Sequence, residues 1–462
     1  MAGFFDKYIT NIAHTETIKY TGSVTAVKGL MIESQGPRSV IGEMCAISVS
    51  GTGERVLAEV VGLEGNVVRL MAYGETKGIE VGDEIVASGH VLEVAVGNGL
   101  LGRVIDATGK AYDRKGEIVP EAFYPATAVS PNPMERQQIV RRMVTGVRAV
   151  DSLLTVGKGQ RLGIFAGSGV GKSTLMSVIA RNTSADINVI GLIGERGREV
   201  QDFLQRDLGE EGLKRSVVVV ATGDQPAIAR LRAAYVTTAI AEYFRDQGKD
   251  VMLMLDSLTR FAHAQREIGL ATGEPPAQRG YPPSVFDLLP RLLERAGTNA
   301  KGSITAFYTV LVDGDDMDEP ITDKVRGTVD GHIVLSRSLA QRQHYPAIDV
   351  LASISRLSRR VTGPETQRAC TQVRRWIATY SGQEEMIHAG VYQKGNNSAI
   401  DEAIDKHEEI ETFLCQEETD ECPIQDTLQR LSALTGIAIP ESEYNEVPAL
   451  ARKLPQDMVQ ST

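Results

Sequence analysis

A lysine and two hydroxyl side chains follow a glycine-rich run that continues directly from a short apolar segment. The apolar residues 162–166 predict a buried parallel strand, and the apolar residues 175–180 predict the start of a helix. Between them, glycines let consecutive backbone N–H groups turn toward an anion, and the helix adds the positive end of its dipole. This order of strand, loop and helix is that of a phosphate-binding P-loop, whose residues here are Gly167, Ser168, Gly169, Val170, Gly171, Lys172, Ser173 and Thr174.

The side chains of this loop suit a nucleoside triphosphate and Mg²⁺. Lys172 would reach the β- and γ-phosphates, and the hydroxyl of Ser173 would take one position on the metal. The pattern begins with Ala166 where a glycine is usual, but that position ends the strand and the change affects the interpretation little. The alternative is a glycine-rich turn with a chance Lys-Ser pair. The motif predicts a triphosphate site and does not say what the energy is used for.

Fast hydrolysis also needs a carboxylate for the metal shell and a group that orients the attacking water. The apolar run 251–255 ends in Asp256, the Walker B form, and we expect Asp256 to hold the Mg²⁺ shell. Glu195 follows the apolar run 187–193, so it would lie at a strand end near the γ-phosphate and orient the water. Glu199 is expected in the outer metal shell. The alternatives are a chance aspartate at a strand end and an exposed loop whose glutamates and arginines pair with each other.

The transition state also needs positive charge. Arg356 follows the apolar segment 347–352, and arginine fingers of this kind are often supplied in trans. From the residues alone Arg356 competes with Arg337, Arg359 and Arg360, and a plain surface arginine is the alternative interpretation.

The central part of the chain alternates apolar runs with helical patterns. A helix is predicted over 228–245, and this texture is typical of an α/β domain that binds ligands at the carboxyl ends of its strands. The predicted strands are 162–166, 187–193, 217–221, 251–255, 304–310 and 332–335.

The two flanks have different textures. Between residues 20 and 96, short β-branched runs separated by glycines predict a small antiparallel barrel, with strands over 24–27, 56–61, 67–70 and 84–87. The barrel region has only Tyr20 and Tyr73 as aromatics, which favours an oligomer collar over a base-stacking platform. After about residue 365 amphipathic helices are predicted over 367–380, 399–415 and 424–434.

Composition shifts place four domains along the chain. The predicted connector at 97–132 is loop-rich, residues 4–14 have an amphipathic helix pattern, and the prolines of the last two dozen residues indicate a frayed tail. The predicted divisions are an N-terminal amphipathic segment 1–20, a β-barrel 21–96, a P-loop ATPase domain 97–364, and a C-terminal helical domain with a flexible tail, 365–462.

Bulk properties exclude some classes of function. The formal net charge of −11 argues against a surface that coats nucleic acid. No apolar run reaches the roughly 18 residues of a membrane span, and the N-terminus lacks an apolar core of signal-peptide length, so a cytoplasmic location is expected. Nothing in the spacing of Cys415, Cys422 and His407 supports a metal site, and free thiols are predicted for all four cysteines, with Cys45 and Cys370.

Together these motifs resemble the hexameric ATPases that include the α and β subunits of rotary ATP synthases. Within that family the sequence is most similar to the export ATPases of bacterial flagella and type III secretion systems. The resemblance runs from about Gly22 to about Gln416. The stretches that carry it are Gly194-Glu-Arg-Gly-Arg-Glu-Val200, Asp256-Ser-Leu-Thr-Arg260-Phe-Ala262, Pro275-Pro-Ala-Gln-Arg-Gly280-Tyr-Pro-Pro-Ser284-Val-Phe-Asp-Leu-Leu-Pro290 and Tyr345-Pro-Ala-Ile-Asp349-Val-Leu-Ala-Ser-Ile-Ser-Arg356.

The resemblance implies a RecA-like α/β P-loop core with an N-terminal small β-barrel and a C-terminal helical domain. It implies ATP and Mg²⁺ as ligands, Glu195 as the catalytic carboxylate, Asp256 as the Walker B aspartate and Arg356 as a finger that reaches the neighbouring subunit of a homohexamer. The implied partners are export-apparatus stator and regulator proteins, stalk proteins, the export gate at the membrane, and export chaperones and substrates. No nucleic acid partner is expected, and the implied location is cytoplasmic, at the inner face of the plasma membrane.

The sequence is also compatible with four other functions. The flagellar reading competes with a virulence secretion ATPase and with the catalytic subunit of a rotary proton or sodium ATPase, although the Pro282-Pro283 loop is of the export type. A hexameric RNA helicase shares the order of barrel and P-loop core, and a non-catalytic scaffold is disfavoured by Glu195. The match around residues 413–416 is weak, so the contacts to the base are left unassigned.

Overall fold

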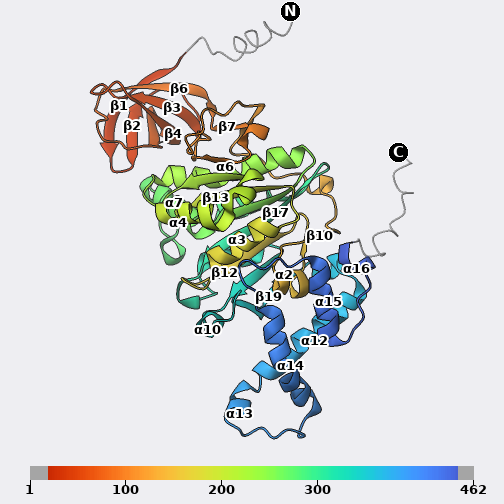
Figure 1. Cartoon of the computed structure of the whole chain (residues 1–462). Helices are drawn as coiled ribbons and strands as arrows, with labels where there is room; N and C mark the ends of the chain where they lie inside the picture. The colour runs from red at the N-terminus through yellow and green to blue at the C-terminus, as the bar shows by residue number, and fades with distance from the viewer. Residues whose placement is uncertain (1–18, 446–462) are drawn as a thin grey trace, which may run out of the picture.

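The computed structural model describes residues 19–445 of the chain. The amphipathic pattern at 4–14 and residues 446–462 of the predicted tail lie outside the described residues. In Figure 1 the described chain forms a small barrel at the top, a central sheet with helices on both faces, and a helical extension at the bottom.

Six antiparallel strands close the N-terminal barrel, in the order β1-β2-β5-β4-β3-β6. The predicted antiparallel barrel is confirmed. The sequence pattern misses β2 and β3 because these strands carry few β-branched residues. Alternating side chains fill the interior, and Ile32, Ile47 and Leu70 are fully buried there. The strands are β1 (Thr21–Lys28), β2 (Met31–Gln35), β3 (Glu43–Ser48), β4 (Arg55–Glu64), β5 (Val67–Ala72) and β6 (Glu84–Val91).

A buried ion pair joins the barrel to the central domain. Arg232 on α6 (Ala227–Asp246) donates from Nε to Glu59 Oε2 on β4 at 2.9 Å, and its Nη2 contacts the other carboxylate oxygen. The hydroxyl of Tyr73 donates to the same carboxylate at 2.7 Å. Burial first, and then the charge of Glu59, raise the pKa of Tyr73 well above its usual value, so this phenol stays a donor. The contact fixes the barrel on α6.

Replacing Glu59 by alanine should lower the free energy of unfolding by about 3 kcal/mol or more, because it leaves a buried guanidinium without its carboxylate. The side chain of Arg232 is only 16% exposed. Urea titration measures the effect. The control is Glu33→Ala, which removes an exposed pair with Lys28 and should change the value by less than about 1 kcal/mol. Equal losses of stability in the two variants would contradict a stabilising role for the buried pair of Glu59 with Arg232.

The central sheet has nine strands, in the order β19-β18-β12-β17-β15-β13-β14-β8, with β16 paired beside β17. Pairs along this path are parallel except β18 with β19. All six predicted strands are confirmed, each within one residue at either end. The bounds are β8 (Arg103–Ile105), β12 (Arg161–Ala166), β13 (Ile187–Ile193), β14 (Ser216–Ala221), β15 (Asp250–Asp256), β16 (Gly297–Thr298), β17 (Ser303–Leu311), β18 (Gly331–Leu335) and β19 (Ile348–Ser355).

Both faces of this sheet are buried, which explains the continuous apolar runs. On β14, Val217 and Val219 belong to one hydrophobic cluster, and Val218 and Val220 belong to the other. Figure 1 shows α6 and α3 on opposite sides of the sheet. The helix predicted over 228–245 is confirmed as α6. The other helices around the sheet are α2 (Arg148–Leu153), α3 (Lys172–Asn182), α4 (Gly197–Asp202), the π-helix η3 (Phe203–Leu208), α5 (Gly209–Lys214), α7 (Leu258–Ala271), α8 (Pro283–Leu293), α9 (Pro320–Thr328), α10 (Arg337–Gln341) and α11 (Ser358–Val361).

The predicted loop-rich connector at 97–132 contains more regular structure than its composition indicates. Its strand β8 pairs with β14 and so extends the central sheet at its edge. An ion pair of 2.8 Å between Arg103 and Asp113 braces this short strand from the loop that follows. Three residues are too few for a periodic signal, and tertiary pairing creates the strand. The remaining small elements are the ribbons of β7 (Glu93–Val96) with β9 (Ala122–Pro125) and of β10 (Arg142–Met143) with β11 (Val156–Gly157), and the 3₁₀ turns η1 (Asn98–Leu100), η2 (Pro133–Glu135), η4 (Gln278–Gly280) and η5 (Asp313–Asp315).

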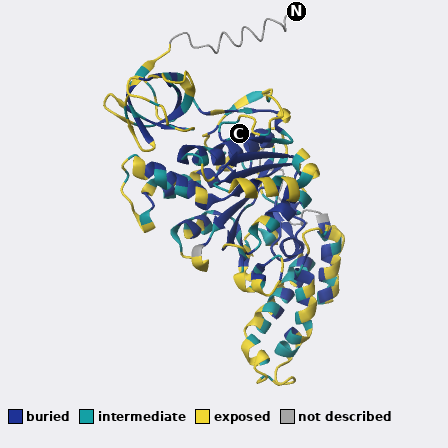
Figure 2. Cartoon of the chain, turned by 60° about the vertical axis from the view of Figure 1, so that its left-hand side comes forward, coloured by how far each residue is buried: buried dark blue, intermediate teal, exposed yellow. Residues whose placement is uncertain are grey.

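The C-terminal part is helical, as predicted. Its three long helices contain the predicted ranges to within a few residues, and they bury apolar faces that include Val373, Ile410 and Leu428. Figure 2 shows that burial is concentrated in the central sheet, whereas the extension is exposed over much of its surface. No helix within residues 19–445 is both long and apolar enough to cross a membrane. The helices are α12 (Pro364–Ser381), α13 (Glu384–His388), α14 (Ser398–Leu414), α15 (Ile424–Thr435) and α16 (Ser442–Asn445).

Candidate functional site

The P-loop lies at the carboxyl end of β12 and leads into α3. Gly171 precedes the helix with a φ of 90°, in the left-handed region, and Gly169 has a φ of 77°. A side chain on Gly171 would also lie 3.5 Å from the ring of Tyr345. Glycine at both positions therefore gives the loop a tight curvature and leaves room on its outer side.

Lys172, Asp256 and Glu195 meet directly after the loop. The ammonium of Lys172 contacts Asp256 Oδ1 and lies 3.7 Å from Glu195 Oε1. The hydroxyl of Thr309 donates to the same Asp256 oxygen at 2.7 Å and so orients the carboxylate. Burial alone would lower the pKa of Lys172, but the charges of Asp256 and Glu195 outweigh it and raise that pKa. The lysine is held as a cation between two carboxylates.

The surroundings of Glu195 disfavour its ionised form. Burial, followed by the negative charge of Asp256, raises the pKa of Glu195 to about 7, against the opposing effect of Lys172. The side chain of Glu199 also disfavours its ionisation. This pocket therefore has more negative charge than its one lysine neutralises, which is the condition that a bound cation relieves.

A cavity of about 120 Å³ connects the residues predicted to hold Mg²⁺. Ser173, Glu195, Glu199 and Asp256 all line it, together with η3 residues such as Phe203. Hydroxyl and carboxylate oxygens are the donors that Mg²⁺ prefers, and such sites are completed by phosphate oxygens and waters. Within residues 19–445 no group of three or more His, Cys, Asp or Glu side chains is arranged to hold a metal by itself. The residues present fit a metal that arrives with phosphates.

The arginines near Glu195 form surface ion pairs. Arg196 pairs with Glu199 at 3.4 Å, and Arg198 pairs with Asp202 at 3.5 Å. Both arginine side chains are more than four-fifths exposed, at 86% and 88%. Glu195 differs from this exposed loop because its side chain is only 16% exposed and faces Lys172.

Arg356 lies at the opposite edge of the sheet from the P-loop. Its backbone N–H donates to Asp330 O at 3.0 Å, and Asp330 N donates to Arg161 O at 2.8 Å, so it stands beside the amino end of β12. At about 3.3 Å per residue the strand separates it from the P-loop by roughly 20 Å. Its side chain is exposed and has no hydrogen bond or ion pair with any described residue. Arg356 therefore cannot serve the P-loop of its own chain.

The competing arginines have other positions. Arg337 pairs with Asp315 at 3.2 Å, and its guanidinium lies 2.9 Å from where a side chain on Gly167 would begin. Arg337 is thus near its own P-loop. Arg359 and Arg360 are exposed on α11.

A second cavity, of about 290 Å³, opens on the outer side of the loop, and its walls combine P-loop residues with Tyr345 and Gln416, for which the sequence predicted no role. Tyr345 lies opposite Gly171, and Gln416 N donates to Tyr345 O at 2.8 Å. The Gln416 side chain accepts from Arg148 N at 2.9 Å and donates to Gly146 O at 2.8 Å. The signal for this pocket in the sequence is the aromatic residue Tyr345, which opens the stretch 345–356 that carries the family resemblance. The other cavity residues are Val147, Gly169, Thr174, Leu175, Val178, Pro346, Glu417 and Glu418.

Three family models match successive parts of the chain. The ATP synthase alpha/beta family, beta-barrel domain, matches residues 24–89. The ATP synthase alpha/beta family, nucleotide-binding domain, matches residues 146–355. The T3SS EscN ATPase C-terminal domain matches residues 362–433. The matches follow the same order as the barrel, the central sheet and the helical extension.

Individual proteins match over almost the whole chain. The flagellum-specific ATP synthase of Treponema pallidum (strain Nichols) is 60% identical over 94% of this chain and 97% of its own. The flagellum-specific ATP synthase of Bacillus subtilis (strain 168) is 54% identical, with 92% and 97% covered. The structure of the assembled ATPase EscN from the enteropathogenic E. coli type III secretion system superimposes with a TM-score of 0.85 at 43% identity, over 90% of this chain and 100% of that one. EscN in complex with its central stalk EscO gives a TM-score of 0.84.

Proposed function

Because this chain belongs to the ATP synthase alpha/beta family, in its branch of flagellar and type III secretion ATPases, we propose that it hydrolyses ATP to drive protein export through a flagellar apparatus. It is an ATP hydrolase of the type III export class, and the flagellum-specific relatives at 60% and 54% identity support the flagellar branch. The observation that carries the proposal is the meeting of Lys172, Glu195 and Asp256 at the P-loop.

This geometry supports a role for each of the site residues. Lys172 binds the β- and γ-phosphates together with the backbone of the loop, and in doing so exchanges its contact with Asp256 for one with phosphate. Ser173 and Asp256 would hold Mg²⁺, with Glu199 in its outer shell, and the metal would supply positive charge against the phosphate oxygens. Glu195 orients the attacking water.

The position of Arg356 supports a homohexamer in which each site is shared. The P-loop and the free Arg356 lie at opposite ends of the sheet, so a site that needs both can form only between two copies of the chain. In a closed ring, every copy supplies its Arg356 to one neighbour and receives an arginine from the other. The EscN structure with a central stalk supports a stalk protein at the centre of the ring. Stator and regulator proteins, the export gate, chaperones and unfolded substrates complete the proposed set of partners.

The proposed location is the cytoplasmic face of the plasma membrane, with peripheral attachment at the export apparatus.

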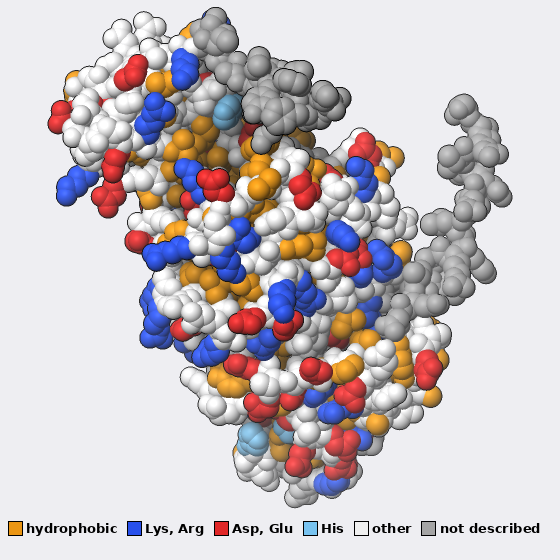
Figure 3. Space-filling view, turned by 45° about the horizontal axis from the view of Figure 1, so that its top comes forward, with side chains coloured by type: hydrophobic (Ala, Val, Ile, Leu, Met, Phe, Trp, Pro, Cys, Tyr) orange, Lys and Arg blue, Asp and Glu red, His pale blue; other side chains and the backbone are white. Residues whose placement is uncertain are grey.

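Two alternative functions lose support. The match of residues 362–433 to the EscN C-terminal domain favours an export ATPase over a rotary catalytic subunit. Figure 3 shows acidic and basic side chains interspersed over one face of the molecule, unlike the continuous basic surface that an RNA helicase would use.

The cavity beside Tyr345 is proposed as the pocket for the base of ATP. Replacing Tyr345 by alanine should raise KM for ATP about tenfold and change kcat less, since stacking of a base on an aromatic ring contributes about 1–3 kcal/mol. Tyr345→Phe keeps the ring and should preserve KM, which separates stacking from any hydroxyl contact. Steady-state kinetics checks both variants. An unchanged KM in Tyr345→Ala would place the base elsewhere.

The proposed function is tested in a flagellated bacterial strain from which the gene for this protein has been deleted. Such a strain should not secrete flagellar filament protein or swim; the wild-type gene should restore both, and a Lys172→Ala gene should restore neither. Purified protein should hydrolyse ATP with Mg²⁺ and lose that activity in EDTA. Normal filament secretion in the deletion strain would contradict the flagellar proposal while leaving ATP hydrolysis intact.

A further inference from the structure

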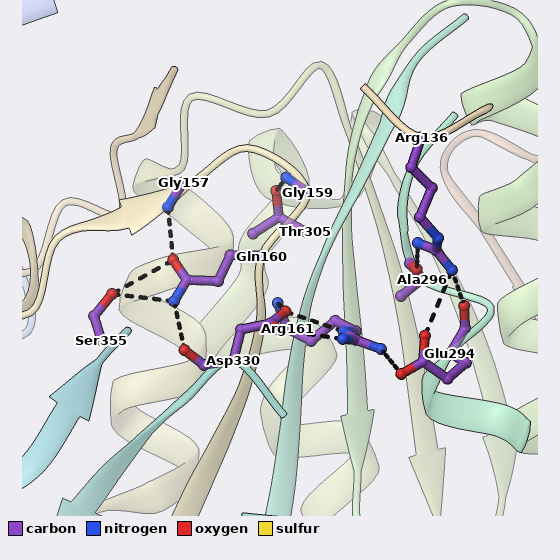
Figure 4. Close-up of polar contacts among 10 residues, drawn as sticks. All are labelled: Arg136, Gly157, Gly159, Gln160, Arg161, Glu294, Ala296, Thr305, Asp330 and Ser355. Carbon is purple, nitrogen blue, oxygen red and sulfur yellow. Dashed lines mark hydrogen bonds and ion pairs between the residues drawn. The ribbon is translucent and has the colours of Figure 1, made fainter. Parts of the chain in front are cut away.

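A polar network holds the chain that carries Arg356, and its centre is the buried side chain of Gln160. Gln160 is fully buried immediately before β12. Its Nε2 donates to Asp330 O at 3.1 Å and to Ser355 Oγ at 3.0 Å, and its Oε1 accepts from Gly157 N at 2.9 Å. Figure 4 shows these contacts converging on one side chain from three separate segments.

One acceptor of Gln160 also binds the backbone of Arg356, and the other belongs to the residue that precedes Arg356. The carbonyl of Asp330 accepts from both Gln160 Nε2 and Arg356 N, at 3.1 and 3.0 Å. Ser355, the residue just before Arg356, accepts from Gln160 and donates to Thr155 O at 2.7 Å. The Nε2 of Gln160 therefore holds the segments that contain Asp330 and Ser355, and its Oε1 holds the amide in place through Gly157 N.

A row of charged side chains also holds Asp330, the residue whose carbonyl binds Gln160. The carboxylate of Asp330 accepts from Arg161 N, Nε and Nη2, at 3.1, 3.0 and 3.1 Å. Arg161 also forms an ion pair of 2.5 Å with Glu294, whose backbone carbonyl accepts from Arg136 at 2.5 Å. Burial would lower the pKa of Arg161, but Asp330 and Glu294 outweigh it and raise that pKa. The guanidinium is thus held as a cation, and Figure 4 shows Arg136, Glu294, Arg161 and Asp330 as one continuous row.

The backbone of β18 at Gly331 lies so close to the end of β19 that no side chain fits between the two strands. A side chain on Gly331 would lie 2.5 Å from Ile354 O and 3.1 Å from Ser355 Cα. The absence of a side chain at Gly331 lets the two backbones pack closely and keeps Ser355 within reach of Gln160. By contrast, the Arg356 side chain itself has no partner among the described residues, so its direction is set by the backbone beneath it.

We propose that Gln160 is a positioning residue that aims Arg356 at the ATP bound by the neighbouring subunit. The inference rests on the proposed role of Arg356 in trans. Gln160 touches neither the phosphates nor the water; it acts through Asp330 O and Ser355. It stands at the start of the strand that ends in the P-loop of its own chain, but it serves the site of the next chain.

Removing the Gln160 amide should lower kcat and leave KM for ATP near its wild-type value. Gln160→Met keeps the length of the side chain and deletes the hydrogen bonds. We expect a loss of about tenfold to a hundredfold in kcat, the range produced when a reacting group is displaced by about 1 Å. Ser355→Ala, which removes one link, should give a smaller loss of the same kind, and Gly331→Ala, which forces Ile354 O to move, should give a loss at least as large as that of Gln160→Met. Gln265→Met, which deletes another buried amide, on α7, is the control for stability.

Mixed oligomers separate positioning of the finger from damage to the P-loop. Gln160→Met protein should regain activity when mixed with Lys172→Ala protein, because it supplies an intact P-loop and receives an intact finger. It should gain nothing when mixed with Arg356→Ala protein, because every finger is then missing or displaced. The reverse pattern would overturn the proposal and would place the effect of Gln160 in its own P-loop.

The mixing experiments give a different result if Arg356 does not act on the neighbouring subunit. If Arg356→Ala and Lys172→Ala proteins do not restore each other, the shared site itself is wrong. If they do restore each other but Gln160→Met does not follow the pattern of Arg356→Ala, only the positioning role is wrong. A wild-type kcat in both Gln160→Met and Ser355→Ala would also overturn the positioning role of Gln160. Should Gln160→Met fail to assemble, Ser355→Ala and Gly331→Ala carry the same mixing test.

Discussion

Replacing Glu195 by glutamine should leave ATP binding nearly unchanged and reduce kcat by several hundredfold or more, on the scale of the loss of a preorganised catalytic group. The amide has the shape of the carboxylate, so the P-loop, Lys172 and Asp256 can still hold the triphosphate. It cannot polarise a water molecule, because it lacks the negative charge. Binding is measured by calorimetry with Mg-ATP, and turnover by phosphate release.

Two controls identify the cause of that loss. Glu199→Gln should have a much smaller effect, since the Glu199 side chain is 47% exposed and is already paired with Arg196. Thermal melting of Glu195→Gln should show no loss of stability, because the substitution removes a carboxylate whose pKa burial and Asp256 have raised to about 7. If Glu195→Gln kept more than about a tenth of the wild-type kcat, another group would have to orient the water.

Arg356→Ala should be almost inactive alone and should become active again in mixtures with inactive Lys172→Ala protein. An arginine finger contributes on the order of 10³–10⁵ in kcat, so each single variant is expected to fall close to background. In a mixed ring, a Lys172→Ala subunit donates its intact Arg356 to the intact P-loop of its neighbour. Activity should therefore peak at intermediate mixing ratios.

The matched control is Arg359→Ala. Arg359 is exposed three residues further along the chain, and its loss should leave kcat within about twofold of wild type, as for an ordinary surface charge. Subunits are mixed before assembly, and oligomer size is checked by light scattering. A monomeric preparation with full turnover, or no recovery at any ratio, would contradict the shared site.

Local signals determined the P-loop side of the site. Residues 162–166, 187–193 and 251–255 are continuous apolar runs because both faces of the sheet are covered, and each is followed by a residue able to bind phosphate, water or metal. Parallel strands place their carboxyl ends at one edge, so order along the chain was enough to predict that Lys172, Glu195 and Asp256 would be close together.

Several contacts were decided only by the tertiary structure. Gln416 reaches Gly146 across 270 residues of sequence, and Gln160 reaches Ser355 across 195. These bonds end largely on backbone carbonyls or on a serine hydroxyl, which are present all along the chain and so give no pattern to search for. The three-residue strand β8 likewise exists because β14 presents it with partners.

The sequence by itself therefore determined which chemistry this protein carries, since periodicity and glycine spacing act over a few residues. The tertiary structure decided how far apart the groups lie and which residues hold them. It separates Arg356 from its own P-loop by the length of β12, and it hydrogen-bonds Gln160 to Asp330 and Ser355, which are distant from it in sequence. Packing sets such distances, and no local pattern encodes them.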